Sequence, residues 1–169
     1  MKRLLLFMAA AFSLSAQQTI HWTATTGSVS QSGSTYTATI QQPATNQQRV
    51  LINKILVYCS VACTVTQSAN GTAATSTAGT ISLTLPSLPT DAMPTATFWT
   101  ASNAGTGSPQ GGITYVPAGG QVVLCTSPSG ACVNQPQIIL VGNGTAANYS
   151  VTISAITGTS NIWFDCFSQ

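Results

Sequence analysis

The sequence predicts an all-β protein, most simply a two-sheet β-sandwich of the jelly-roll type with about ten short strands. Thr is the commonest residue after position 16, and its β-branched side chain suits a pleated strand better than a helix. Apolar and polar residues alternate in several short segments, whereas no segment longer than one turn repeats its apolar residues with the helical period. Turn signals that contain Gly or Pro separate these segments, as expected for a sandwich.

Residues 1–16 have the parts of a secretory signal peptide. Lys2 and Arg3 precede an apolar stretch at residues 4–12, and small residues lead to an expected cleavage site after Ala16. The apolar stretch is shorter than the roughly 20 residues that cross a bilayer. We therefore expect a secreted, extracellular or cell-surface protein with no membrane insertion after the leader is cleaved.

The first strands are expected at residues 19–25 and 34–42, joined by a turn rich in Ser and Gly. Residues 17–48 would then form a polar N-terminal β-hairpin. Such a segment could act as a donor that adds a strand to the open sheet edge of the next subunit. A stretch at 43–48 that begins with Pro separates the hairpin from a β-sandwich domain at residues 49–169.

Residues 49–58 form the most apolar segment of this domain and predict a central strand that is buried on both faces. Clean alternation predicts strands at 80–85 and 148–157, and a Pro-Ala-Gly-Gly turn separates two others. In chain order, the strands expected in the domain are 49–58, 63–67, 80–85, 95–101, 113–116, 121–125, 137–141, 148–157 and 161–167.

The segments at 57–79 (VYCSVACTVTQSANGTAATSTAG) and 145–164 (TAANYSVTISAITGTSNIWF) carry a family resemblance. They resemble the start and end of a loosely defined, mostly uncharacterised group of small bacterial and phage-associated jelly-roll β-sandwich proteins. The resemblance covers roughly residues 50–167 and rests on strand-and-turn patterns. It implies a jelly-roll fold and a structural or surface-associated role, and it brings no catalytic residues with it.

Ionisable side chains are nearly absent after the leader, and this bounds the function. Only Arg49, Lys54, Asp91, Asp165 and His21 remain, with no Glu, so the net charge is zero. General acid–base catalysis and hard-cation sites depend on the residue types that are missing. A neutral surface also gives no electrostatic attraction for nucleic acid or anionic lipid. We therefore expect no enzyme, no cofactor, no metal site and no nucleic-acid partner.

The cysteines predict disulfides, as is usual in an exported chain. Cys125 and Cys132 bracket a turn-rich loop and could join its ends. Cys59 and Cys63 could bond only if residues 60–62 turn, because four positions along an extended strand are too far apart. Cys166 is then left over. Its alternatives are an intermolecular disulfide, a buried free thiol or a different pairing.

Two further sets of side chains have open alternatives. Trp22, Trp99 and Trp163 could face a ligand as a platform on which sugar rings stack, or they could pack the sandwich. Lys54 interrupts the most apolar strand. It could extend outward, pair with Asp165 or form an isopeptide bond with an Asn.

The expected function is that of a secreted, non-enzymatic structural or surface protein that self-associates, such as a subunit of a filament or surface layer. Little charge repulsion between copies and strand edges rich in Thr favour this. The alternative is a monomeric carbohydrate-binding or adhesive module. The expected partners are accordingly copies of the chain or other surface proteins, with glycans as the second option.

Overall fold

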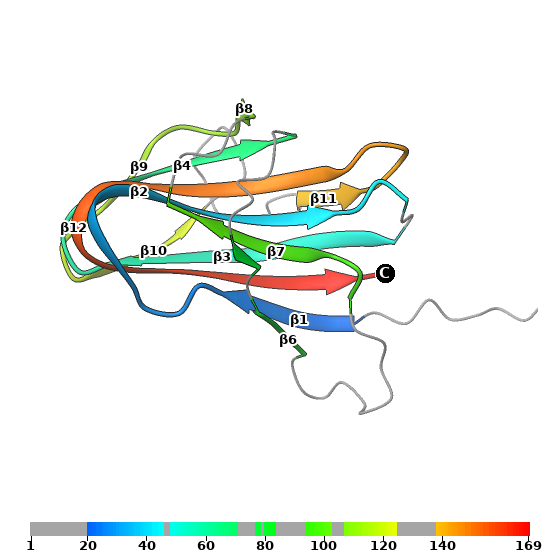
Figure 1. The fold of residues 1–169 in the computed structure, drawn as a ribbon, viewed down its shortest axis with the longest axis horizontal. Helices are drawn as coiled ribbons and strands as arrows, with labels where there is room; N and C mark the ends of the chain where they lie inside the picture. The colour runs from blue at the N-terminus through cyan, green and yellow to red at the C-terminus, as the bar shows by residue number, and fades with distance from the viewer. Residues whose placement is uncertain are drawn as a thin grey trace, which may run out of the picture.

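A computed structural model describes residues 20–45, 48–70, 77–78, 80–83, 94–102, 107–124 and 138–169. Every helix or strand among these residues is a β-strand, which confirms the all-β prediction. The strands form one antiparallel sheet of 12 strands that curls on itself (Figure 1). The leader, Asp91 and the pair Cys125 and Cys132 lie outside the described residues.

The strands differ greatly in length, from two residues to 22. Their bounds are β1 (Ile20–Thr25), β2 (Val29–Gln42), β3 (Arg49–Cys59), β4 (Cys63–Ala69), β5 (Thr77–Ala78), β6 (Thr80–Leu83), β7 (Thr97–Ala101), β8 (Ser108–Pro109), β9 (Thr114–Val116), β10 (Gly120–Leu124), β11 (Ile138–Val141) and β12 (Ala147–Ser168).

Strand β12 organises the sheet, because its two ends belong to different parts of it. Its N-terminal part pairs with β2 on one side and β4 on the other. Its C-terminal part pairs with β3 and β1. Between them β12 bends back on itself, as Figure 1 shows, so the sheet is folded across its middle. We call the parts the N-half (β12 N-terminal part, β2, β4, β7) and the C-half (β12 C-terminal part, β1, β3, β10, β11).

Other chain segments change direction beside the bend of β12, and we call this region, with the turns at 60–62 and 117–119, the corner. Strands β1 and β2 follow one another along one side of β12, and β3 and β4 follow one another along the other. Strands β9 and β10 lie in turn along β4 and β3. The turn between them uses Gly119 with φ +67°, a backbone conformation that residues with a side chain rarely adopt.

Gly158 lies where β12 passes close to the 60–62 turn, just after the register shifts in its pairing with β2 between Ile153 and Thr157. A Cβ atom there would lie 2.7 Å from Oγ of Ser60 and 3.1 Å from Cγ2 of Val61. Ser60 cannot easily move away, because its Oγ accepts a hydrogen bond from the backbone N of Thr159 at 2.7 Å. The bend and the 60–62 turn therefore fit together only with glycine at position 158.

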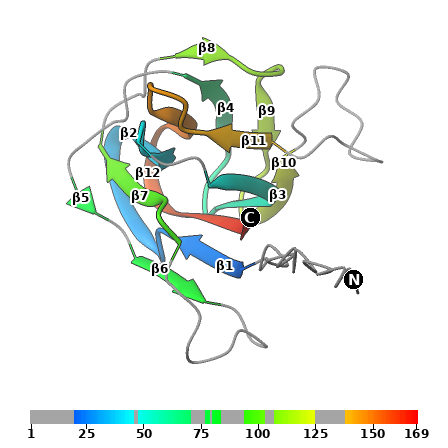
Figure 2. The ribbon, with the colours of Figure 1, turned by 90° about the vertical axis from the view of Figure 1, so that its right-hand side faces the viewer.

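Figure 2 shows the strands of both halves arranged around a common centre. Buried side chains of both halves form one core cluster there. The C-half contributes Trp22, Ile55 and Phe164, and the N-half contributes Ile40 and Phe98. Phe98 and Phe164 make an edge-to-face contact with ring centroids 5.9 Å apart, which joins the halves directly. Apolar residues at alternate positions thus form a single core, as the alternation predicted.

The N-terminal strands correct one expectation. Residues 17–48 were predicted to form a hairpin, but β1 and β2 do not pair with each other, and both pair with β12. Their inward side chains, including the fully buried Trp22 and Ile40, belong to the common core. The alternating pattern was interpreted correctly as strand, whereas the partner of each strand depended on residues more than 100 positions away.

The remaining differences concern β3, β12 and the layering of the sheet. Strand β3 is central, since it pairs on both edges, but Lys54 and Tyr58 on its outward side are exposed, so only one face is fully buried. The strands predicted at 148–157 and 161–167 are one continuous strand, because pairing with β2 continues through the bend. Hydrogen bonding is likewise continuous between the halves, and the separate sheets of a jelly roll stay a prediction.

Candidate functional site

The outward face of the C-half gathers the charged side chains. Among the described residues, the Lys, Arg, Asp and His side chains are Arg49, Lys54, Asp165 and His21. Strand alternation and register place all of them on this face of β1, β3 and β12. We call the outward side of β1, β12, β3, β10 and β11 the candidate face.

The centre of the candidate face is a hydrogen-bonded cluster around Asp165. Its Oδ1 atom lies 2.5 Å from Nε2 of His21, and its Oδ2 atom accepts a hydrogen bond from Nδ2 of Asn53 at 2.7 Å. The imidazole of His21 also stacks on Phe167, with ring centroids 4.5 Å apart. The carboxylate, which is mostly buried, is thus held by side chains from the strands on both sides of β12.

A β-bulge in β3 positions Asn53 for this contact. The pairing of β12 with β3 shifts between Asp165 and Cys166, so that Asn53 is the extra residue opposite them. Asn53 and Lys54 therefore both point outward, although they are consecutive. Asn53 was not among the residues predicted from the sequence. Its signal was the succession of two polar residues, Asn53 and Lys54, within an apolar strand, which indicates a bulge.

Lys54 lies directly across from Asp165 in the register of β3 and β12. The ion pair with Asp165, one of the three alternatives for Lys54, does not form: among the described residues Asp165 forms its ion pair with His21. Both carboxylate oxygens of Asp165 are already engaged by His21 and Asn53. Lys54 is exposed, which fits the alternative in which its side chain extends into solvent.

Apolar rows lie on each side of this polar centre. Strand register aligns Trp163, Leu56 and Val123 in one row. It aligns Phe167, Leu51 and Ile139 in the other. At the outer end of each row the side chain is uncovered: Val123 is 41% exposed and Ile139 is 54% exposed. Tyr58 and Val141 add further exposed apolar surface to the same face.

Strands β10 and β11, which carry Val123 and Ile139, contain no charged residue. Both pair with the same edge of β3, one after the other. Natural proteins commonly protect the edge of a sheet with charged side chains, prolines or covering segments. Exposed apolar side chains on uncharged strands at the margin of the sheet are instead typical of a protein–protein contact.

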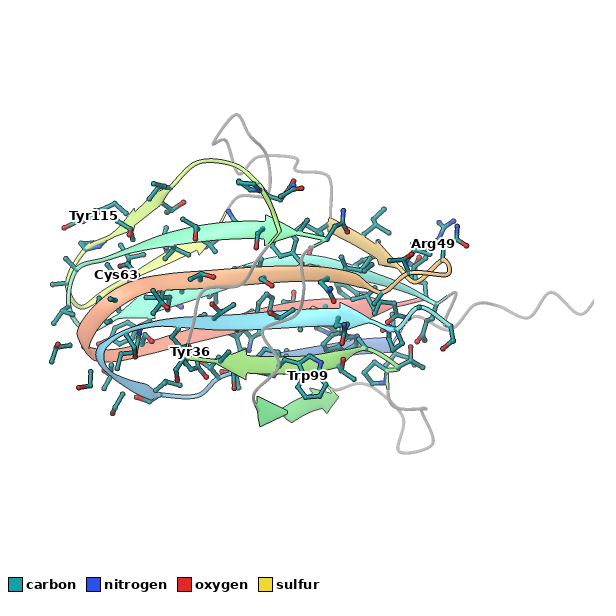
Figure 3. The ribbon with its side chains drawn as sticks, turned by 45° about the horizontal axis from the view of Figure 1, so that its top comes forward. Tyr36, Arg49, Cys63, Trp99 and Tyr115 are labelled. Atoms are coloured by element: carbon teal, nitrogen blue, oxygen red, sulfur yellow. A yellow bond between two sulfur atoms is a disulfide. The ribbon has the colours of Figure 1, made fainter. Side chains whose placement is uncertain are left out.

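The tryptophans do not come together as the expected platform. Trp22 is fully buried, and its Nε1 donates to Oγ of Ser168 at 2.8 Å, so it cannot face a ligand. Trp99 is half-buried on β7 in the N-half, where its Nε1 lies 2.9 Å from Oγ1 of Thr97 (Figure 3). Trp163 is half-buried on the candidate face. Of these side chains, only Trp163 belongs to the candidate site.

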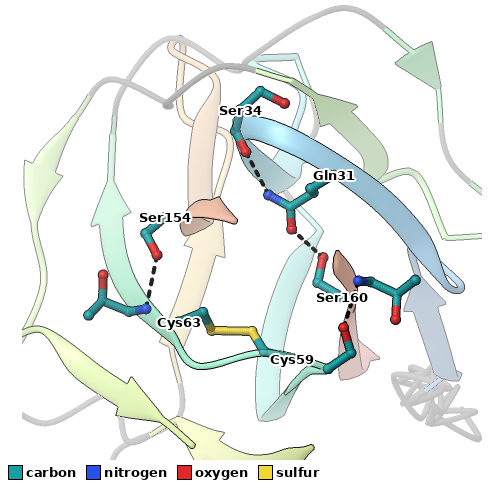
Figure 4. Close-up of a disulfide and its surroundings, with 9 residues drawn as sticks. Gln31, Ser34, Cys59, Cys63, Ser154 and Ser160 are labelled. Atoms are coloured by element: carbon teal, nitrogen blue, oxygen red, sulfur yellow. Dashed lines mark hydrogen bonds between the residues drawn. A yellow bond between two sulfur atoms is a disulfide. The ribbon is translucent and has the colours of Figure 1, made fainter. Parts of the chain in front are cut away.

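The structure answers part of the cysteine prediction. Cys59 and Cys63 form a disulfide across the 60–62 turn, with Cα atoms 6.4 Å apart, so the predicted turn is confirmed (Figure 4). Cys166 is a free cysteine with no exposed surface. Burial raises the pKa of its thiol well above the ordinary value, and the charge of Asp165 adds to this. In this conformation the thiol cannot reach a second chain.

Hydrogen bonds beside the disulfide hold the same corner together (Figure 4). Oγ of Ser160 donates to Oε1 of Gln31 at 2.7 Å, and Nε2 of Gln31 donates to the carbonyl of Ser34 at 2.8 Å. On the other side, the backbone N of Thr64 donates to Oγ of Ser154 at 3.0 Å. The corner is therefore a cross-linked, structural part of the molecule and not a candidate reactive site.

Among the residues that the structure describes, no group of three or more His, Cys, Asp or Glu side chains could hold a metal ion. The same residues include no helix that is long and apolar enough to cross a membrane. Comparison of the chain with known protein families, with curated proteins and with solved structures finds no match.

Proposed function

We propose that this protein is an exported, non-enzymatic structural or surface protein that self-associates through the candidate face. The observation that carries the proposal is the pair of apolar rows, which end in exposed Val123 and Ile139 on uncharged strands. Contact with a second copy would remove this apolar surface from water, which is the main favourable term in protein association.

The make-up of the face supports a protein partner. Interfaces are enriched in aromatic residues and depleted of charge at their centre. Here Tyr58, Trp163 and Phe167 supply aromatic surface. Of the charged side chains on this face, Asp165 already has His21 and Asn53 as partners, so burying it would not leave it without hydrogen bonds. Lys54 and Arg49 are exposed, and their long side chains can keep the charged ends in water at the rim of the contact.

Symmetry decides what kind of assembly results. If the face meets the same face of another copy, the contact closes into a dimer with a two-fold axis. If it meets a different surface of the next copy, the contact repeats and builds a filament or layer. The sequence-based expectation of a filament or surface layer corresponds to the second arrangement.

Other observations support a structural, non-enzymatic role. After the expected leader the chain has one His, two Asp and no Glu, which is a poor set for acid–base catalysis. The sheet folded across its middle supports a jelly-roll topology, as does the resemblance to jelly-roll surface proteins. A donor-strand role of residues 17–48 has less support, because β1 and β2 already pair within their own sheet.

Light scattering after size exclusion, together with electron microscopy of the same fractions, tests the proposal on the mature chain without reductant. We expect dimers or larger species that persist when reductant is added, because Cys166 is buried. Ile139→Lys should weaken association at least about tenfold, since it would bury a charge in the contact. The control is Ile113→Lys, at a still more exposed position beside β9 (73% against 54% for Ile139), which should leave association unchanged.

A clean monomer at all concentrations would overturn the proposal and favour the monomeric carbohydrate-binding or adhesive module. If Ile113→Lys disrupts association and Ile139→Lys does not, the protein self-associates through another surface. Export is tested separately by the intact mass of the secreted protein, which should correspond to a chain that begins at Gln17.

A further inference from the structure

A cavity of about 410 Å³ lies on the outward face of the N-half, away from the candidate face. Its floor includes Thr66 and Ser68 of β4 and Thr152 of β12, which are neighbours across the strand pair. Its wall includes Pro109, Gly112 and Ile113 from the segment that runs along the edge of β4. We infer that this cavity is a binding site for a neutral carbohydrate of one or two sugar rings.

The volume suits such a ligand. Sites for small molecules usually measure about 300–1,000 Å³, and this cavity lies near the lower end of that range. A Cβ atom on Gly112 would have no neighbour within 4 Å, so the wall leaves open space beside it. Glycine backbone at the wall also lets a ligand approach the main chain closely.

The floor offers the hydrogen bonding that sugars require. Each hydroxyl of Thr66, Ser68 and Thr152 can both donate and accept, as the hydroxyls of a sugar do. Oγ1 of Thr152 is held at 2.9 Å from Oγ1 of Thr37, so its position is set before a ligand arrives. None of the described lining residues is charged, which favours a neutral ligand over a phosphate or an acidic sugar.

The wall and the adjoining surface add apolar contacts. Ile113 is 73% exposed and Tyr115 is 64% exposed. Both belong to the segment that leads into and forms β9, where Tyr115 pairs with Thr64 of β4. Sugar rings present C–H groups that pack on such surfaces, and an aromatic side chain is well suited to this contact. Tyr115 thus extends the site beyond the cavity.

Titration calorimetry and saturation-transfer NMR of the mature chain with cellobiose, maltose, lactose and N,N′-diacetylchitobiose test this inference. At least one of these disaccharides should bind. Thr66→Val keeps the shape and β-propensity of the side chain and removes one hydroxyl, so it should weaken binding about 3- to 10-fold. Thr157→Val is the matched control, since Thr157 is an exposed threonine of β12 that does not line the cavity.

Gly112→Leu fills the open space beside the wall and should abolish binding without a change in thermal unfolding. Absence of binding by all four sugars would overturn the inference. So would binding that neither Thr66→Val nor Gly112→Leu weakens, because the sugar would then lie elsewhere. Ile139→Lys separates this site from the proposed assembly, because it should leave sugar binding unchanged.

Discussion

The outward faces of the halves differ in a way that reverses the usual relation between polarity and burial. On the N-half, the hydroxyl side chains Thr37 and Thr39 are 0% exposed, and Ser150 is almost completely buried. On the C-half, the apolar side chains Val123 and Ile139 are largely exposed. The polarity of a residue on these faces therefore does not decide how far its side chain is buried.

The buried hydroxyls are stable there because they satisfy each other. Oγ1 of Thr37 lies 2.9 Å from Oγ1 of Thr152, and Oγ1 of Thr39 lies 2.8 Å from Oγ of Ser150. Buried polar groups need such partners, since an unpaired one loses its hydration without compensation. On the C-half, by contrast, the apolar side chain of Ile139 remains 54% exposed to solvent. This difference is why we assign association to the C-half.

The largest expected effect on stability tests whether the polar centre organises the candidate face. Asp165→Ala removes the acceptor for both His21 and Asn53, and we expect the free energy of unfolding to fall by about 2–3 kcal/mol. Urea denaturation measures the loss. Lys54→Ala is the control and should change stability by less than about 0.5 kcal/mol, because the side chain is exposed. Equal losses in the two variants would show that Lys54 is the true partner.

A smaller effect is expected on the N-half, where the hydroxyl pairs are tested one at a time. Thr39→Val keeps the shape of the side chain but leaves Oγ of Ser150 without this partner, which should cost about 1–2 kcal/mol. Adding Ser150→Ala should recover part of the loss, because no buried hydroxyl is then left unpaired. Thr64→Val is the control at an exposed position and should leave the free energy of unfolding unchanged. If Thr39→Val also leaves it unchanged, Thr39 is hydrated and the outward face of the N-half is open to water.

The smallest expected effect concerns Cys166, on the inner side of the strand that carries Asp165. Burial and the nearby carboxylate raise the pKa of the thiol, so it stays protonated and should not react with iodoacetamide at pH 8 unless the protein unfolds. Peptide mass mapping locates the label. Rapid labelling of Cys166 in the folded protein would contradict its burial.

The same raised pKa gives the direction of the pH dependence. The folded protein holds the thiol proton more tightly than the unfolded chain, so this contribution to stability is complete below the ordinary cysteine pKa of about 8.5. It is lost as the pH rises above that value. The free energy of unfolding should therefore fall more steeply with rising pH in the natural protein than in Cys166→Ala.

Strand positions and the disulfide turn were accessible to sequence analysis because they depend on neighbouring residues. Alternation over a few positions identified β1 and β2, and a continuous apolar run identified β3. The spacing of Cys59 and Cys63 required the turn that the structure contains. The bulge at Asn53 left a local trace as well. The interruption in β12 was misread, because the strand stays paired with β2 through register shifts between Ile153 and Thr157, whereas a glycine in sequence suggests a turn.

The sequence by itself determined the all-β class, the position of most strands and the scarcity of charge, because each follows from residue type and short-range period. Only the tertiary structure decided which outward face is covered, that His21 and not Lys54 pairs with Asp165, and that Trp22 is core while Trp163 is surface. His21 and Asp165 are 144 positions apart, and Thr39 and Ser150 are 111 apart. Contacts at such separations arise from strand pairing and from the fold of the sheet across its middle, which no local pattern specifies.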